Sequence, residues 1–223
     1  MDLDTQAKFD TLIAQAASTK DKLFYAGLRL FAQKGYANVG IRELCRMVHI
    51  KESSFYNHYQ SKESLFEAIL TWFDKASNQV VMNDAEIHAM IEQGDVRAFF
   101  IDNMRRFSAI TSNVLYHTAL QIVLTESFLH PTAAEIAKKN LYYLRRDYTG
   151  QVLRGLMARG AIRPCDAEAV TAEYYYALKG MLDEFLLLQL WDADLSAINA
   201  RIRAHIDFFS DLLAVPPEER MSP

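Results

Sequence analysis

Residues 49–66, HIKESSFYNHYQSKESLF, combine hydrogen-bonding side chains and aromatic rings in one short segment. Lys51, Glu52 and two serines are followed at once by the run FYNHY at residues 55–59. A buried helix would not contain so many hydroxyls and amides, and a solvent-facing helix would not contain so many rings. We therefore expect one face of this segment to meet a partner other than water, through charges and hydrogen bonds.

Three short helices are predicted over residues 19–60 to position this segment. The first begins at Ser18, which with Asp21 resembles a capping box, and it ends where Gly35 can provide a left-handed cap. The second is about eight residues long and has a single apolar stripe. The apolar positions of this second helix recur at i, i+3, i+4 and i+7: Ile41, Leu44, Cys45 and Val48.

The third helix carries Phe55 and Tyr59 at i, i+4 spacing, with Ile50 in the preceding turn, and these residues can complete a small core. Ser54 and His58 lie at the edges of its opposite side. The remaining side chains on that opposite side are Glu52, Ser53, Tyr56 and Asn57. Two short helices joined by a tight turn form a helix-turn-helix, whose second helix fits the major groove of DNA.

The charge distribution supports contact between this segment and a polyanion. Residues 19–62 contain eight Lys or Arg against three Asp or Glu, whereas residues 63–223 contain 15 against 22. A basic segment joined to an acidic body suggests that only the basic segment meets a polyanion. Chance clustering of charged residues is the alternative explanation.

The composition favours a helical and cytoplasmic protein. Eight glycines and five prolines in 223 residues are fewer than most strand-rich folds need, and 51% hydrophobic residues can form a substantial core. Cys45 and Cys165 are too few for a disulfide framework. The N-terminus lacks the features of a signal peptide, and no apolar stretch has the length of a membrane span. Neither a cofactor nor a metal site is expected.

Long helices are predicted beyond residue 60. The first starts from an N-cap at Ser61 and continues through SKESLFEAILTWFDKASNQVV, while Gly94, Pro131 and Gly160 mark later boundaries. The helices expected after it span residues 84–93, 95–111, 113–129, 131–159, 166–190 and 194–214. The prediction is an all-α fold of four parts: an N-terminal extension (1–18), a three-helix helix-turn-helix domain (19–62), a larger helical domain (63–215) and a frayed tail (216–223).

Residues 20–66 resemble the DNA-binding domain of the tetracycline-repressor (TetR/AcrR) family of transcriptional regulators. The matching segments are LFAQKGYANVGIRELCRMV and SSFYNHYQSKESLF. Gly35–Tyr36, Tyr56–Tyr59 and Ser61–Glu63 fill the places of three family motifs at the family spacing. The resemblance implies a ligand-responsive repressor that binds a palindromic DNA operator as a homodimer. It also implies that the larger helical domain serves ligand binding and dimerisation.

The sequence departs from the family pattern at a few positions. Gly40 stands where the family often has a Thr or Ser that caps the second helix beside a phosphate, and glycine offers no hydroxyl. His49 replaces the turn glycine and tolerates a positive φ less easily. The start of the third helix differs as well, at Lys51, Glu52 and Ser53.

A first set of side chains is expected to contact the DNA backbone. Lys62 begins a long helix, where its charge and the free N–H groups attract phosphate. Tyr56 can donate its hydroxyl to a phosphate, as the family does at this position, and His58 either contacts phosphate or packs against the protein. Arg42 and Arg46, on the second helix, are expected to hold the backbone rather than to contact bases.

A second set is expected to contact base edges in the major groove. Asn57 could pair with adenine and Lys51 with guanine. Glu52 could accept a hydrogen bond from cytosine N4, or it could equally repel phosphates and fix the register. Ser53 and Ser54 lie on the same surface.

The helical body contains many aromatic residues, which in most proteins are simply core. The family, however, holds a small-molecule pocket in this part of the chain. Aromatic and Met side chains with a few polar tips would suit an apolar or planar effector. The residues expected to line such a pocket are Trp72, Phe100, Met104, Phe107, Tyr116, His117, Tyr143 and Tyr175.

The helices at residues 166–190 and 194–214 are apolar on more than one face. By resemblance they pair with the same two helices of a second copy, and a deep core is the alternative. An enzyme is not expected, because the chain lacks zinc-protease, serine-hydrolase, P-loop and dinucleotide-binding motifs. The alternatives to a ligand-responsive repressor are a ligand-independent DNA-binding architectural protein and an all-helical enzyme.

Overall fold

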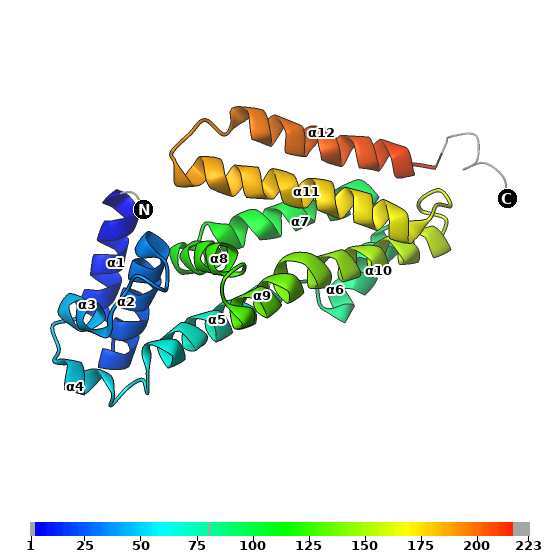
Figure 1. The fold of residues 1–223 in the computed structure, drawn as a ribbon. Coiled ribbons are helices and arrows are strands. Elements are labelled where there is room, and N and C mark those ends of the chain that lie inside the picture. Colours follow the sequence, from blue (N-terminus) through cyan, green and yellow to red (C-terminus); the bar gives the residue numbers. More distant parts are fainter. Residues whose placement is uncertain (1–2, 80, 216–223) are drawn as a thin grey trace. The chain divides into compact units, whose positions relative to one another are not determined.

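The computed structural model describes residues 3–79 and 81–215, which contain helices and no strand (Figure 1). This confirms the predicted all-α fold. The frayed tail predicted at residues 216–223 lies outside the described residues. The helices are α1 (Leu3–Gln15), α2 (Thr19–Lys34), α3 (Ile41–Met47), α4 (Glu52–Phe55), α5 (Lys62–Asn78), α6 (Asp84–Gln93), α7 (Val96–Thr111), α8 (Val114–Glu126), α9 (Pro131–Ala137), the π-helix η1 (Lys138–Tyr143), α10 (Leu144–Ala158), α11 (Ala167–Leu190) and α12 (Ser196–Leu213).

The chain divides into two compact units. The first unit contains Met1–Val80 and Ser108–Tyr142, and the second contains Val81–Phe107 and Tyr143–Pro223. Among the described residues, no helix is long and apolar enough to cross a membrane.

Helix α2 is the centre of the first unit and packs against α1, α3, α5 and α8. It begins at Ser18, whose hydroxyl oxygen accepts the Asp21 N–H at 3.1 Å, as the sequence predicts. An added Cβ at Gly27 would lie 3.1 Å from both Ile69 Cδ1 and Leu65 Cδ2 of α5. The absence of a side chain at Gly27 therefore lets α2 and α5 approach closely.

Helix α1 was not predicted and covers one side of α2. Its Phe9 is fully buried, and Ile13 lies one turn further along the same face. Arg29 of α2 forms an ion pair with Asp10 of α1. The segment called an N-terminal extension therefore adds a packed helix to the first unit.

Helix α5 begins at the predicted N-cap and ends before the predicted boundary. Ser61 and Ser64 form a reciprocal capping box, in which each backbone N–H donates to the other side chain at 3.1 Å. The last residue of the helix is Asn78. Near this end, Phe73 stacks on Tyr116 of α8 at 5.0 Å, and the Tyr116 hydroxyl lies 3.1 Å from Ser77 Oγ.

The single helix predicted at residues 131–159 is interrupted by the π-helix η1. Within η1, the buried Asn140 donates from Nδ2 to the Ile136 carbonyl at 3.1 Å and to Asp74 Oδ1 of α5 at 2.7 Å. The Ile136 carbonyl is the one that an α-helical N–H of residue 140 would use. Competition by the Asn140 side chain for this carbonyl accounts for the wider turn.

The second unit is built on α10, which contacts α6 and α11, while α11 also contacts α12. Gly155 of α10 allows the approach of α6, because an added Cβ would lie only 2.3 Å from Ile91 Cδ1. Helices α6, α11 and α12 closely follow their predicted bounds. The core is formed mainly by fully buried aliphatic and aromatic side chains, including Phe99, Phe100, Val152, Leu153, Leu156 and Ile198.

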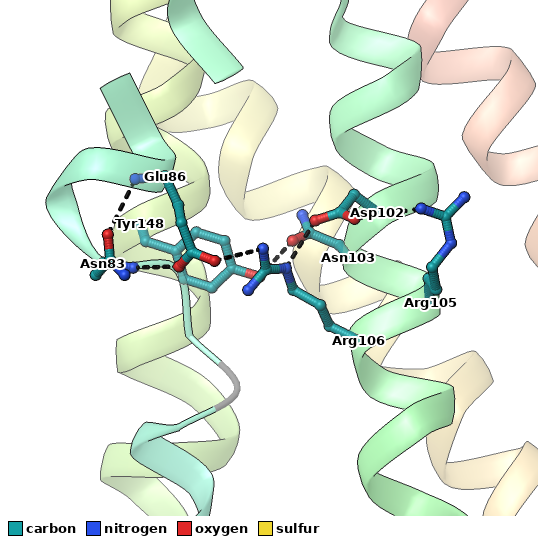
Figure 2. Close-up of polar contacts among 7 residues, drawn as sticks. All are labelled: Asn83, Glu86, Asp102, Asn103, Arg105, Arg106 and Tyr148. Carbon is teal, nitrogen blue, oxygen red and sulfur yellow. Dashed lines mark hydrogen bonds and ion pairs between the residues drawn. The ribbon is translucent and has the colours of Figure 1, made fainter. Parts of the chain in front are cut away.

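A polar network crosses the second unit at Arg106 of α7 (Figure 2). The Arg106 guanidinium donates to Asp102 Oδ2 at 2.7 Å and to Glu86 Oε1 at 2.8 Å. Glu86 also accepts the Asn83 N–H at 2.9 Å and so completes the capping box of α6. This arginine therefore ties the first turn of α6 to α7.

Two buried tyrosines in this unit differ in how their hydroxyls are satisfied. The Tyr148 hydroxyl donates to Asn103 Oδ1 at 2.7 Å (Figure 2). The Tyr174 ring stacks on Phe100 at 4.1 Å and on His205 at 5.0 Å, but its hydroxyl has no hydrogen-bond partner among the described residues. Burial raises the pKa of Tyr174, so this hydroxyl stays protonated and neutral.

We predict opposite stability effects for the two Tyr→Phe substitutions. Tyr174→Phe removes an unsatisfied buried hydroxyl and is expected to raise the free energy of unfolding by about 1 kcal/mol. Tyr148→Phe leaves the Asn103 carbonyl oxygen without its donor and is expected to lower it by about 1–3 kcal/mol. Urea denaturation of the two variants measures the difference. A loss of stability in Tyr174→Phe as large as in Tyr148→Phe would mean that a bound partner satisfies the Tyr174 hydroxyl.

Candidate nucleic-acid interface

Helices α3 and α4 form a helix-turn-helix, with residues 48–51 as the connection. The turn closes through the Ile50 N–H, which donates to the Cys45 carbonyl at 3.0 Å. His49 adopts a φ of 56° and is exposed. The left-handed backbone that the family's turn glycine provides is therefore present here with a histidine.

Helix α4 is shorter than the third helix predicted from the sequence, because Tyr59 lies beyond its last residue, Phe55. The chain continues as a tightened turn, in which the His58 and Tyr59 N–H groups both donate to the Phe55 carbonyl, at 2.9 and 3.0 Å. Serine and asparagine are weak helix formers, and Ser53, Ser54 and Asn57 are concentrated in this segment. Their local preferences account for the early end of the helix.

The two sides of this segment are separated as predicted. Phe55 is fully buried and Tyr59 is 7% exposed, so both belong to the core. Ser54 and His58 are half-buried at the edges. The opposite side forms an exposed row, hereafter the polar row, of Lys51, Glu52, Ser53, Tyr56 and Asn57.

Two residues expected at the DNA are paired with each other in the structure. Arg42 Nε of α3 donates to Glu52 Oε1 of α4 at 2.8 Å, and both side chains are exposed. The ion pair joins the first turn of α3 to the first turn of α4. Arg46 is also exposed on α3. Because this ion pair is exposed to solvent, Arg42 can exchange the Glu52 carboxylate for a DNA phosphate with little loss of free energy.

Gly40 is the N-cap of α3 and has no side chain to accept the free N–H groups of the first turn. Its φ of −99° is accessible to any residue, and an added Cβ would meet nothing within 4 Å. The first turn of α3 is therefore left open at its N-terminus.

Lys62, the first residue of α5, is held against the protein by Tyr36. Its ammonium donates to the Tyr36 carbonyl at 2.8 Å and lies 4.1 Å from the centre of the Tyr36 ring. One of three ammonium protons is used in this hydrogen bond. The contacts restrict the position of the charge and leave two donors for another acceptor.

Tyr36, which the sequence identifies only as part of a family motif, organises the contacts around Lys62. Its N–H donates to the buried carboxylate of Glu126 at 2.7 Å, and its hydroxyl donates to Glu63. Glu63 also lies 2.7 Å from His130 Nε2. The Tyr36 hydroxyl, followed by His130, holds the pKa of Glu63 below its usual value. The available signal was an aromatic residue directly after the helix-ending Gly35.

The residues expected to line an effector pocket are divided between the two units. Two of them are core residues, since Phe100 is fully buried and Tyr116 is 2% exposed. Tyr143, in contrast, is exposed at the surface. Trp72, Tyr116 and His117 belong to the first unit, and Phe100, Met104, Phe107, Tyr143 and Tyr175 belong to the second.

Comparison with known proteins points to one family. Residues 23–69 match the model described as bacterial regulatory proteins, tetR family. The biofilm operon icaADBC negative transcriptional regulator IcaR of Staphylococcus aureus is 32% identical over 74 residues, which cover 33% of this chain and 40% of IcaR. The match therefore spans less than half of that relative. The transcriptional regulator UidR of Escherichia coli is 21% identical over 165 residues, covering 73% of this chain and 79% of UidR.

Similarity to solved structures covers most of the chain. The crystal structure of a TetR family transcriptional regulator from Pseudomonas syringae covers 90% of this chain with 100% of its own, at a TM-score of 0.58 and 16% identity. The similarity confirms a helix-turn-helix domain followed by a helical domain.

The turn at His49 gives a stability prediction. His49→Gly is expected to raise the free energy of unfolding by about 0.5–1 kcal/mol, because glycine adopts a positive φ without steric cost. The side chain is exposed, so no buried contact is lost. The matched control is His88→Gly in α6, an exposed helical position where glycine should cost roughly 0.5 kcal/mol. Chemical denaturation of both variants should show opposite signs, and a loss in both would contradict the interpretation.

Proposed function

Because the chain belongs to the TetR family of bacterial regulatory proteins, we propose that it is a ligand-responsive repressor that binds a near-palindromic DNA operator as a homodimer. Repression is supported by the relative IcaR, which is a negative transcriptional regulator. Binding of a small molecule to the helical body releases the operator.

The polar row is the observation that carries this proposal. Its side chains are exposed on one side of α4, while Phe55 and Tyr59 on the other side anchor the segment in the core. An anchored short helix can enter the major groove, which presents a donor and acceptor pattern for each base pair. Asn57 suits adenine and Lys51 suits guanine, with Ser53 and the half-buried Ser54 beside them.

Phosphate contacts come from Tyr56 of the polar row and from groups around the row. Lys62 presents a positioned ammonium at the N-terminus of α5, and Tyr56 is 57% exposed with its hydroxyl available to donate. His58 contributes from the edge of α4. Gly40 brings the open first turn of α3 close to the backbone, and Arg42 can exchange Glu52 for a phosphate. These groups fix the position of the protein on DNA without selecting a sequence.

The exposed apolar side chains of α11 and α12 support a homodimer through these helices. Leu187 is 58% exposed and Trp191 is 77% exposed, four residues apart at the end of α11. On α12, exposed residues recur every fourth position, at Ala200, Ala204, Phe208 and Leu212. Small and large apolar residues in one helical stripe suit close packing against another helix. Two copies related by a two-fold axis then meet two similar half-sites, which makes the operator near-palindromic.

The effector is proposed to bind the helical body. In the second unit, Phe100, Met104, Phe107 and Tyr175 are among the residues expected to line its pocket, and the unpartnered Tyr174 hydroxyl offers a polar group for orientation. Release of DNA requires that the effector bind more tightly to a state with wrongly spaced DNA-binding domains. An effector with equal affinity for both states would change nothing.

We predict two distinguishable classes of DNA-binding variant. Lys62→Ala should weaken binding to all sequences alike and make the salt dependence shallower by roughly one unit, because one phosphate contact is lost. Asn57→Ala or Lys51→Ala should cost roughly 1–3 kcal/mol on the operator and relax the preference at one base pair per half-site. Fluorescence anisotropy against operator and random duplexes, at several salt concentrations, separates the classes.

The combined variant in which Lys51, Ser53, Ser54 and Asn57 are all alanine tests α4 as the sequence-selecting element. Selection from random DNA should recover no preferred sequence. Survival of the original preference would show that another element selects the sequence.

The dimer surface gives a further prediction. Leu187→Glu and Phe208→Glu should each yield a folded monomer, because both side chains are exposed within one copy and a buried charge would disrupt the interface. Gln151→Glu, at an exposed position of α10, is the matched control and should stay dimeric. Sedimentation velocity at micromolar concentration measures the state, and circular dichroism verifies folding. A native protein that sediments as a monomer would overturn the proposed interface.

A further inference from the structure

A cleft of about 460 Å³ lies in the first unit between α2 and α5, next to the end of the helix-turn-helix at Tyr59. We propose that this cleft binds a small planar aromatic carboxylate. The site goes beyond the proposed function, because it lies in the first unit, which also contains the helix-turn-helix, and it contains no residue of the polar row. Trp72, one of the residues expected to line an effector pocket, belongs to the first unit and lines this cleft.

Four of the ten residues that line the cleft are aromatic. They are Phe24 and Tyr25 of α2, the buried Tyr59, and Trp72 of α5. Phe24 and Trp72 meet edge to face, with ring centres 6.1 Å apart, and both remain half-buried. Because these two rings already touch, a planar ligand ring would pack on their exposed surface by stacking and edge contacts rather than between them.

The charges in the cleft favour an anion. Lys20 and Lys75 line it, and neither forms an ion pair with a carboxylate among the described residues. The single acid, Asp21, accepts the Ser18 hydroxyl at 2.7 Å and lies in the first turn of α2. Two ammonium groups against one carboxylate leave a positive charge, which a ligand carboxylate would neutralise through charge-assisted hydrogen bonds.

The volume of the cleft is compatible with a small molecule as the occupant. A volume of about 460 Å³ lies within the range of roughly 300–1,000 Å³ typical of small-molecule sites, and it accommodates one or two fused rings. The DNA backbone is the other anion that could reach this cleft. Proteins contact it through charges and hydrogen bonds, which do not require aromatic side chains. The combination of rings and lysines therefore favours an aromatic carboxylate over a phosphate.

The test uses the full chain with Trp191→Phe, which leaves Trp72 as the sole tryptophan. Trp191 is 77% exposed within one copy and lies on the proposed dimer surface, where phenylalanine keeps an aromatic ring, so sedimentation velocity first verifies that the variant has the native oligomeric state. The probe is trans-cinnamate, with the neutral cinnamyl alcohol as its matched control. We expect cinnamate to change the Trp72 fluorescence saturably, and calorimetry to give the same dissociation constant. Cinnamyl alcohol should bind at least fivefold more weakly, because it cannot pair with the lysines.

Two lysine variants test the contribution of charge. Lys20→Gln and Lys75→Gln should each weaken cinnamate binding about fivefold to tenfold. Lys22→Gln is the matched control, since it removes the same charge from the same turn of α2 but does not line the cleft. It should leave the affinity unchanged. Phe24→Leu should weaken cinnamate and cinnamyl alcohol alike, because it removes a ring contact and no charge.

Four results would each overturn the proposal. The first is the absence of saturable binding at millimolar cinnamate. The second is equal affinity for cinnamate and cinnamyl alcohol. The third is a loss in Lys22→Gln as large as in the cleft variants, which would indicate surface charge alone. The fourth is displacement of cinnamate by any DNA duplex together with weaker DNA binding in Lys20→Gln and Lys75→Gln, which would assign the cleft to the DNA backbone. None of these results bears on the operator preference of the polar row, so the proposed function is tested separately.

Discussion

The first unit depends on Tyr36, a residue that uses its ring and all its polar groups to join segments distant in sequence. Its N–H, hydroxyl and carbonyl engage Glu126, Glu63 and Lys62 in turn, and its ring packs on Phe66 at 4.4 Å. These contacts connect the end of α2 to the start of α5 and the end of α8. The first turn of α5, and with it the ammonium of Lys62, is thereby held in a fixed place beside the helix-turn-helix.

Much of the fold follows from local signals in the sequence. Ser61 caps α5, Gly94 ends α6 with a left-handed φ of 71°, and Pro131 starts α9. Each signal acts on backbone within a few residues, so it can be recognised without knowledge of the fold. The division of α4 into a buried and an exposed side was predictable for the same reason, since the spacing of Phe55 and Tyr59 defines the buried side.

Two of the features that were missed depend on contacts between distant residues. Helix α1 is stabilised by the burial of Phe9, and α1 packs against α2. The π-helix η1 involves Asn140 and Asp74, which are 66 residues apart. The early end of α4 is a local effect of its serines and of Asn57. It was missed because the i, i+4 spacing of Phe55 and Tyr59 suggested a longer helix. The sequence could not separate core rings from ligand-lining rings, because both have the same spacing on a helix and only the packing partners distinguish them.

The polar row separates stability from recognition. The side chains of Lys51, Ser53 and Asn57 make no hydrogen bond or ion pair within residues 3–79 and 81–215, whereas Phe55 and Tyr59 hold the same segment in the core. Substitutions of these three residues therefore leave the packing of the domain untouched. After gene duplication, a copy of this protein could acquire a new operator through a few surface changes while keeping its framework. Selection on DNA targets can thus proceed almost independently of selection on folding.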